Sequence, residues 1–249
     1  MDPRVSVIVP AYRCERTVEK SIRSALSGTV RDMEVIVADD ASDDGTPDIL
    51  RALAAEDVRV RVITLPENKG VANARNRAVE AARADWIAFL DSDDQWETDK
   101  LERQLQLAEE TGADLVYTAA VCIDENDRET GKVFSVPPRI TADRLLRSPD
   151  VVTSTVLVRK ALYEAHPMER GDLHEDLICW YRILKDGAEA FGIGEPLVRY
   201  RVSAGSKSGN KWKSGVMAWR TYAYLKLGFF KQCRSFLGYC WHGVKRYWL

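Results

Sequence analysis

Short apolar runs alternate with amphipathic segments along the first hundred residues of the chain. The runs at 5–9, 34–38, 60–65 and 86–90 have the length and the β-branched content of buried strands. Between the first two runs, apolar residues recur at the spacing of one helical face, at Val18, Ile22, Ala25 and Leu26. This alternation predicts βαβ units, and therefore an α/β fold with a mostly parallel sheet flanked by helices.

The pattern loosens after residue 100. There we expect a helix to about residue 110, a strand near 115–121 and another strand near 151–158. No internal repeat or low-complexity tract marks a separate domain in this part of the chain. We therefore predict one domain, followed by a helical C-terminal region: the domain at 1–205, with halves at 1–110 and 111–205, and the C-terminal region at 206–249.

Charge sets the C-terminal region apart from the rest of the chain. Residues 1–195 hold all 38 acidic residues and 25 of the 36 basic ones, a net charge of −13, whereas residues 196–249 hold the other 11 basic residues. Half of the 22 aromatic residues lie between Trp212 and Trp248. Basic amphipathic helices with aromatic residues bind anionic membranes, so we expect peripheral membrane contact through 214–249. The alternative is packing on the core or on a second subunit of a homo-oligomer. The acidic remainder of the chain argues against nucleic acid as a partner.

The cysteines and the hydropathy pattern bear on location. The five cysteines are scattered and form no Cys-x-x-Cys pair, which is typical of reduced thiols rather than of a zinc or redox motif. The first strand-like run begins within a few residues of Met1, and no stretch approaches the roughly 18 uninterrupted apolar residues that span a bilayer. We therefore expect a cytoplasmic protein that touches a membrane only from the side.

Polar motifs follow the first two predicted strands, where open α/β sheets bind their ligands. Pro10, Ala11 and Tyr12 follow the first strand, and Asp40 lies in the acidic segment after the second. A base could stack on Tyr12, and the Asp40 carboxylate could accept the imide proton of uracil. The alternative is that Tyr12 only packs and that the segment after Asp40 is a solvated turn with a helix cap.

Two further motifs follow the third and fourth strands. Asp91 and Asp93 lie one residue apart directly after a buried strand, and paired carboxylates bind a hard divalent cation such as Mg²⁺ or Mn²⁺, which can bridge a diphosphate. An acidic surface turn is the alternative. Asn68 and Arg75 flank the start of a helix, an end that favours anionic ligands. Because Arg75 and Arg77 are two apart on that helix, only one can face the cleft, and we expect Arg75 there.

Together these four segments, at 5–12, 38–46, 68–76 and 89–94, closely resemble those of the inverting glycosyltransferases of family 2, which have the Rossmann-like GT-A fold. The resemblance implies that 1–110 is the nucleotide-sugar-binding half and 111–205 the acceptor half. It implies that the nucleotide-sugar contacts Pro10, Ala11, Tyr12, Asp40, Asn68, Arg75, Asp91, Ser92 and Asp93, and that Asp91 and Asp93 serve the metal ion.

Two later segments are also similar to motifs of this family. Residues 173–182 resemble its Glu-Asp motif, which implies that Asp176 is the catalytic base and that Glu175, Trp180 and Arg182 lie on the acceptor side. Without the resemblance, the two acids are favourable charges in the first turn of a helix. Residues 200–208 resemble a segment that closes over the diphosphate, for which the candidates are Ser206, Lys207 and Lys211; Ser203 stands where many relatives have His.

The sequence thus predicts a metal-dependent inverting transferase with Mn²⁺ or Mg²⁺ as cofactor. It would move a sugar from a nucleotide-sugar, with UDP as the expected nucleotide, to a hydroxyl of a glycan or lipid-linked glycan. The expected setting is bacterial cell-surface polysaccharide synthesis at the cytoplasmic face of the inner membrane. Two alternatives stay open: a sugar transferase that uses polyprenyl phosphate as acceptor, and a nucleotide-binding scaffold subunit without catalysis.

Overall fold

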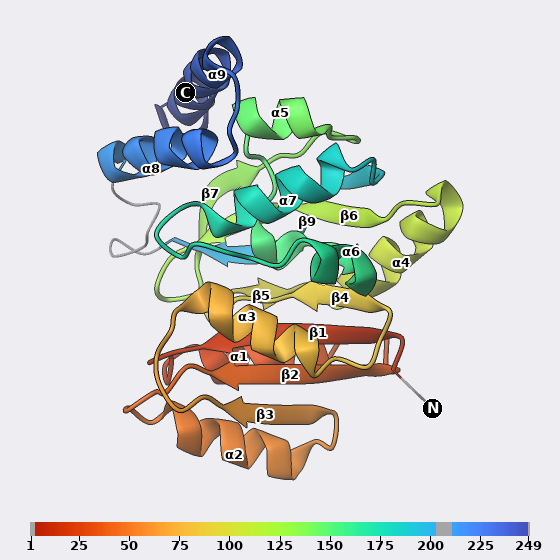
Figure 1. Ribbon diagram of the computed structural model, residues 1–249. Helices are drawn as coiled ribbons and strands as arrows, with labels where there is room; N and C mark the ends of the chain where they lie inside the picture. The colour runs from red at the N-terminus through yellow and green to blue at the C-terminus, as the bar shows by residue number, and fades with distance from the viewer. Residues whose placement is uncertain (1–2, 203–210, 249) are drawn as a thin grey trace.

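The computed structural model describes residues 3–202 and 211–248, without the side chains at 211–212 and 245–248. Figure 1 shows a central sheet with helices on both faces, running from β3 and α2 at one end of the molecule to α8 and α9 at the other. The α/β fold with a mostly parallel sheet and a helical C-terminal region is therefore confirmed.

Four parallel strands in the order β3-β2-β1-β4 form the first half of the sheet. Helices cover both faces of β1, β2 and β4, which are buried throughout and mostly apolar, whereas the edge strand β3 is only partly buried. The elements are β1 (Val5–Ala11), α1 (Val18–Leu26), β2 (Met33–Asp39), α2 (Thr46–Glu56), β3 (Val60–Thr64), α3 (Val71–Glu80) and β4 (Trp86–Phe89). The predicted strands agree with these bounds within two residues at each end.

The second half of the sheet is mixed. β8 pairs antiparallel with β4 on one side and with β6 on the other. β6 pairs parallel with β9, and β9 pairs antiparallel with β5, which is the last strand in the order. β7 pairs antiparallel with β6. The elements are β5 (Gln95–Trp96), α4 (Lys100–Thr111), β6 (Leu115–Ile123), β7 (Glu129–Phe134), α5 (Ala142–Arg147), β8 (Leu157–Arg159), α6 (Lys160–Ala165), α7 (Glu175–Lys185) and β9 (Ala190–Arg201).

The strand expected at 151–158 was only partly right. The chain instead forms a 3₁₀ helix, η1 (Thr153–Thr155), and only then enters β8. Distant groups hold this irregular backbone: the Gln104 side chain donates to the Thr155 carbonyl at 2.8 Å, and the Ser154 hydroxyl accepts from the Asp91 amide at 3.0 Å. These contacts satisfy backbone groups that a strand would have paired in a ladder, and they bring Ser154 beside the end of β4.

The C-terminal region consists of α8 (Lys211–Tyr224) and α9 (Phe229–Trp248), which pack against each other and against α5. The buried Tyr222 hydroxyl donates to the Leu146 carbonyl at 2.5 Å. At Gly238 an added Cβ would come within 2.8 Å of the Arg147 Cβ, so α9 approaches α5 closely there. In the described part of the chain, no helix is both long and apolar enough to cross a bilayer.

Candidate active site

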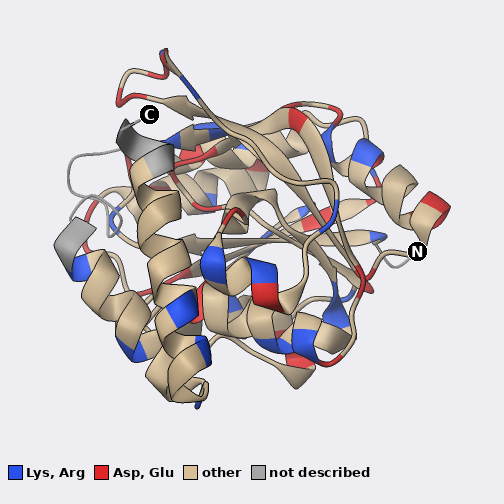
Figure 2. Ribbon diagram, turned by 90° about the horizontal axis from the view of Figure 1, so that it is seen from above, with Lys and Arg blue, Asp and Glu red and all other residues tan. Residues whose placement is uncertain are grey.

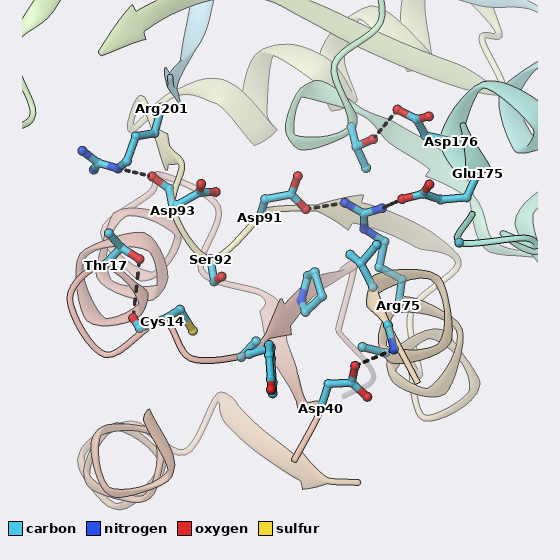
Figure 3. Close-up of a pocket in the computed structure, with 18 of the residues that line it drawn as sticks. Cys14, Thr17, Asp40, Arg75, Asp91, Ser92, Asp93, Glu175, Asp176 and Arg201 are labelled. Atoms are coloured by element: carbon cyan, nitrogen blue, oxygen red, sulfur yellow. Dashed lines mark hydrogen bonds and ion pairs between the residues drawn. The ribbon is translucent and has the colours of Figure 1, made fainter. Parts of the chain in front are cut away.

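A cavity of about 1020 Å³ opens beyond the carboxyl ends of β1, β2 and β4, between the two halves of the sheet. Its position is the one at which open α/β sheets bind ligands. Figure 3 shows 18 of the residues that line the cavity, with the hydrogen bonds and ion pairs among them. The cavity is lined by every residue predicted to contact the nucleotide-sugar: Pro10, Ala11, Tyr12, Asp40, Asn68, Arg75, Asp91, Ser92 and Asp93.

Asp40 joins three loops at one corner of the cavity. Its amide donates to the Ala11 carbonyl at 2.8 Å, which continues the β1–β2 ladder by one residue. Its buried carboxylate accepts the amides of Lys69 at 3.0 Å and of Gly70 at 2.7 Å. Gly70 has φ 88°, a conformation that glycine adopts without strain, so the loop turns directly into α3. Tyr12, 41% exposed, also lines the cavity, and the Arg13 guanidinium lies 5.2 Å from the centroid of its ring.

Arg75 crosses from the first half of the site to the second. Its guanidinium donates to the Asp91 carboxylate at 2.6 Å and lies 3.6 Å from the Glu175 carboxylate. Burial alone would lower the pKa of Arg75, but the charges of Asp91 and Glu175 outweigh it and raise that pKa. Arg77 lies on the surface, paired with Glu80. Of the two arginines, Arg75 lines the cavity and Arg77 does not.

Three aspartates follow β4: Asp94 is bonded inside the protein, whereas Asp91 and Asp93 line the cavity. Asp94 is buried, and its carboxylate accepts from the Ser154 hydroxyl at 2.5 Å and from the Arg201 amide at 2.8 Å. The Arg201 guanidinium donates to the Asp93 carbonyl at 2.9 Å. These bonds fix the turn and leave the side chains of Asp91 and Asp93 at the cavity.

Asp91 and Asp93 are the residues that could hold a divalent cation. Burial and the neighbouring Asp91 charge raise the pKa of Asp93 to about 6, so this carboxylate lacks a full compensating charge. A cation at this place would supply the missing charge, and carboxylate oxygens suit Mg²⁺ or Mn²⁺. No group of three or more metal-ligating side chains exists among the described residues. Two carboxylates fit a cation that a diphosphate and water also coordinate.

Asp176 and Glu175 open α7 on the far wall of the cavity. Glu175 is turned toward Arg75, whereas Asp176 accepts a hydrogen bond from the Thr153 hydroxyl at 3.3 Å. Figure 3 shows Asp93 and Asp176 on opposite sides of Asp91. Asp176 is therefore a carboxylate that faces the cavity without an ion pair to a described residue.

Two of the predicted acceptor-side residues lie elsewhere. Trp180 is 1% exposed and packs in the core, with its ring centroid 5.6 Å from that of Phe89. Arg182 pairs with Glu169 at 3.1 Å and does not line the cavity. Only the first turn of α7 reaches the cavity, and Trp180 lies about 6 Å farther along the helix, over the sheet. The prediction that Trp180 and Arg182 face the acceptor was therefore wrong. Ser206, Lys207 and the side chain of Lys211 lie outside the described part of the chain.

Sequence reasoning missed several residues that position the site. Arg201 is buried at the end of β9 and binds the Asp124 carbonyl at 2.6 Å and the Asp127 carboxylate in addition to Asp93. Ser154 reaches Asp94 across sixty residues of chain. An arginine at the end of a long strand was the one available signal, since a buried arginine requires acidic or carbonyl partners. Nothing local in the sequence marks Ser154 or Thr153.

The fold and this cavity define a protein of the open-sheet α/β class, with its cavity beyond the carboxyl ends of the parallel strands. The profile of Glycosyl transferase family 2 matches residues 6–166, and the chain belongs to that family and is a glycosyltransferase. It is 35% identical over 245 residues to TuaG of Bacillus subtilis (strain 168), whose description places it in teichuronic acid biosynthesis; the match covers 98% of this chain and 97% of TuaG. It is 36% identical over 209 residues to the Escherichia coli UDP-Glc:α-D-GlcNAc-diphosphoundecaprenol β-1,3-glucosyltransferase WfaP, covering 84% of this chain and 81% of WfaP.

Solved structures share the fold. The structure of S. aureus TarS residues 1–349 in complex with UDP-GlcNAc superposes with a TM-score of 0.73 at 19% identity, over 98% of this chain and 73% of that one. The mannosyltransferase PcManGT of Pyrobaculum calidifontis, in complex with GDP-Man and Mn²⁺, superposes with a TM-score of 0.68 at 21% identity, over 96% of this chain and 70% of that one. Both similarities confirm the GT-A fold.

Proposed function

We propose that this glycosyltransferase is metal-dependent and inverting, and that it moves a sugar from a UDP-sugar to a hydroxyl of a lipid-linked glycan. The observation that carries the proposal is the arrangement of Asp93, Asp91 and Asp176 around one cavity, with Arg75 between the walls. Two relatives support a role in bacterial cell-surface polysaccharide synthesis. TuaG is described as a glycosyltransferase of teichuronic acid biosynthesis, and WfaP as a glucosyltransferase that acts on α-D-GlcNAc-diphosphoundecaprenol.

In this proposal each wall of the cavity has one task. The Asp176 carboxylate accepts the proton of the acceptor hydroxyl while the oxygen attacks the anomeric carbon. The bond from that carbon to the diphosphate breaks on the opposite face, so the configuration inverts and a nucleoside diphosphate leaves. Asp91 and Asp93 would hold a Mn²⁺ or Mg²⁺ ion, which would supply a Lewis acid for the leaving diphosphate. Arg75 adds a fixed positive charge nearby.

The nucleotide of the donor would bind at the corner of the cavity around Asp40. The uracil ring would stack on Tyr12 and present its imide N–H to the Asp40 carboxylate, which accepts one amide on each oxygen and keeps a further lone pair on each. Asn68, whose side chain accepts the Gly70 amide at 3.1 Å, lies at the same corner, and Ser92 lines the cavity between Asp91 and Asp93 in the chain. We propose that residues 1–110 bind the donor, that 111–205 bind the acceptor, and that 206–249 hold the enzyme at the cytoplasmic face of the inner membrane.

The test is a thermal-shift series with UDP-, TDP- and GDP-sugars, each with and without Mn²⁺. A UDP-sugar with Mn²⁺ should raise Tm most, since a ligand at a hundred times its Kd stabilises the fold by about 2.7 kcal/mol. Asp93→Asn should lose the metal-dependent part of the shift, whereas Asp48→Asn, on the outer surface of α2, should keep it. Absence of a metal-dependent shift with every donor would overturn the proposal.

A further inference from the structure

The outer face of α9 exposes a line of large apolar side chains. Phe230 is 88% exposed, Leu237 69%, Trp241 68% and Val244 45%. Their spacings of seven, four and three residues place them on one side of the helix. The opposite side packs inward, with Gln232 and Ser235 buried. We call these four residues the α9 stripe; a soluble surface rarely gathers so many large apolar groups in one line.

Cations border the α9 stripe. Arg147, Lys231 and Arg234 line a hollow of about 270 Å³ between α5 and α9, and Phe230 forms part of its wall. The one acid in this hollow, Asp143, already pairs with Lys231 at 2.6 Å. The hydrogen bond from Lys231 and the charges of the two arginines lower the pKa of Asp143, so three cations in this hollow share one carboxylate. Figure 2 shows Lys and Arg along α8 and α9, and the sequence has no Asp or Glu after Glu195.

This combination selects one occupant for the surface. A second copy docked on the same face would bring the α9 stripe together but would also place Arg234 and its neighbouring lysines against their own copies. A membrane with anionic phospholipid presents phosphates to the cations and an apolar layer to the α9 stripe. The helix cannot span that membrane, so it would lie flat on it.

We infer that the α9 stripe docks on a bilayer surface that contains anionic phospholipid, with Arg147 and Arg234 at the lipid phosphates. The adjoining helix α8 connects this face to the active-site cavity. Its Met217 lines that cavity, and its Thr221 hydroxyl accepts the His174 amide at 3.2 Å, next to Glu175. One helix, α8, therefore links the docked face to the acceptor wall of the cavity. The inference deepens the proposed function, because an acceptor held in a bilayer is reached only from its surface.

The experiment is flotation of the full chain with vesicles of phosphatidylcholine alone and of phosphatidylcholine with phosphatidylglycerol. The protein should float with the anionic vesicles, and more weakly with the neutral ones. Phe230→Ser with Trp241→Ser should lower the partition coefficient about tenfold or more. Val58→Ser, at a 96% exposed site far from α9, is the matched control and should leave it unchanged. Arg234→Gln should weaken binding to the anionic vesicles and leave binding to the neutral vesicles unchanged. Arg128→Gln, in the exposed β6–β7 turn, is its control and should change neither.

Three results would overturn the inference: no flotation with anionic vesicles, equal flotation of the stripe variant, or a concentration-dependent dimer that Trp241→Ser dissociates. Circular dichroism and Tm of each variant establish that it is folded. Failure of the proposed function is read separately, from the thermal shift with a UDP-sugar and Mn²⁺ in the absence of vesicles. A protein that floats but binds no sugar nucleotide leaves the docking inference standing, and the reverse result leaves the proposed function standing.

Discussion

Glu175 and Asp176 are adjacent in the chain but have different surroundings. Glu175 lies 3.6 Å from the Arg75 guanidinium and is buried, whereas Asp176 is half-buried at the cavity and touches the Thr153 hydroxyl. An ion-paired carboxylate is a poor proton acceptor, because its partner stabilises the charged form. At the residue scale, Asp176 is therefore the better candidate for the base, and Glu175 for the counter-charge of Arg75.

Replacing Asp176 with Asn should separate transfer from donor binding. We expect kcat to fall by a factor of about 10² to 10⁴, since Glu175, the other α7 carboxylate that lines the described cavity, is ion-paired with Arg75. The thermal shift with a UDP-sugar should be unchanged, because the donor corner around Asp40 lies apart. Asp48→Asn serves as the control for both readouts. Full activity of Asp176→Asn would instead indicate a phosphate acceptor, which needs no base.

Arg75→Met should destabilise the fold strongly. Asp91 and Glu175 would keep their charges in a partly buried site and would lose the guanidinium that stabilises them, a change that costs about 3 to 5 kcal/mol of unfolding free energy. Arg77→Met is the matched control, since Arg77 forms only an exposed pair with Glu80 and should cost less than about 0.5 kcal/mol. Urea unfolding of both variants measures the difference; equal losses would refute the role given to Arg75.

At the scale of elements, α9 can approach α5 closely because residue 238 is a glycine and has no side chain. A Cβ at Gly238 would lie 2.8 Å from the Arg147 Cβ and 3.2 Å from its Cα, whereas a Cβ at Gly243 on the same helix meets nothing within 4 Å. Gly238→Ala should therefore push the helices apart and lower the free energy of unfolding by about 1 to 3 kcal/mol. Gly243→Ala should raise it by about 0.5 to 1 kcal/mol, since alanine is the better helix former. Thermal unfolding of the pair tests the sign, and a gain at both sites would contradict the packing described.

The same scale explains what the sequence could predict. β1, β2 and β4 are covered on both faces, so they read as apolar runs that end where the polar motifs begin. That is why Tyr12, Asp40 and Asp93 could be expected at one edge of the sheet. η1 has no such pattern, because Gln104 and Ser154 hold it through contacts across many residues.

Long-range contacts also set the limits of the site prediction. Arg201 binds Asp93, Asp124 and Asp127 from the end of β9, and no spacing rule links those positions. Trp180 was misplaced because helical spacing fixes which face a side chain takes but not how far along the helix the cavity extends. The structure gives the positions of these residues, and their roles toward a ligand stay predictions.

Across the whole molecule, opposite charges are separated along the chain. The net charge of the chain is −2, yet residues 1–195 carry a net charge of −13. Residues 196–249 contain 11 basic residues and no acidic residue. Figure 1 places α8 and α9 at one end of the molecule, away from β3 and α2. Oppositely charged regions on different molecules attract, and a net charge near zero offers little overall repulsion.

We therefore expect weak attraction between molecules of the purified protein at low ionic strength. The second virial coefficient from static light scattering should be more negative at about 20 mM salt than at about 300 mM, where the Debye length is shorter than the distance between such regions. Lys226→Gln with Arg234→Gln should reduce this salt dependence, and Arg51→Gln on α2 should not. A coefficient that does not vary with salt would contradict the charge separation as a source of attraction.

The aligned strand ends have an evolutionary consequence. In the parallel ladder Ala11 pairs with Asp39, and Asp39 pairs with Thr64. Inserting or deleting one residue within such a strand turns every later side chain to the other face and moves the following motif by about 3.3 Å. We therefore expect descendants of a common ancestor to lengthen exposed turns away from the site, such as the turn around Val58, while the residue counts within β1 and β2 stay fixed. Strand length is then inherited more faithfully than most of the side chains that the strands carry.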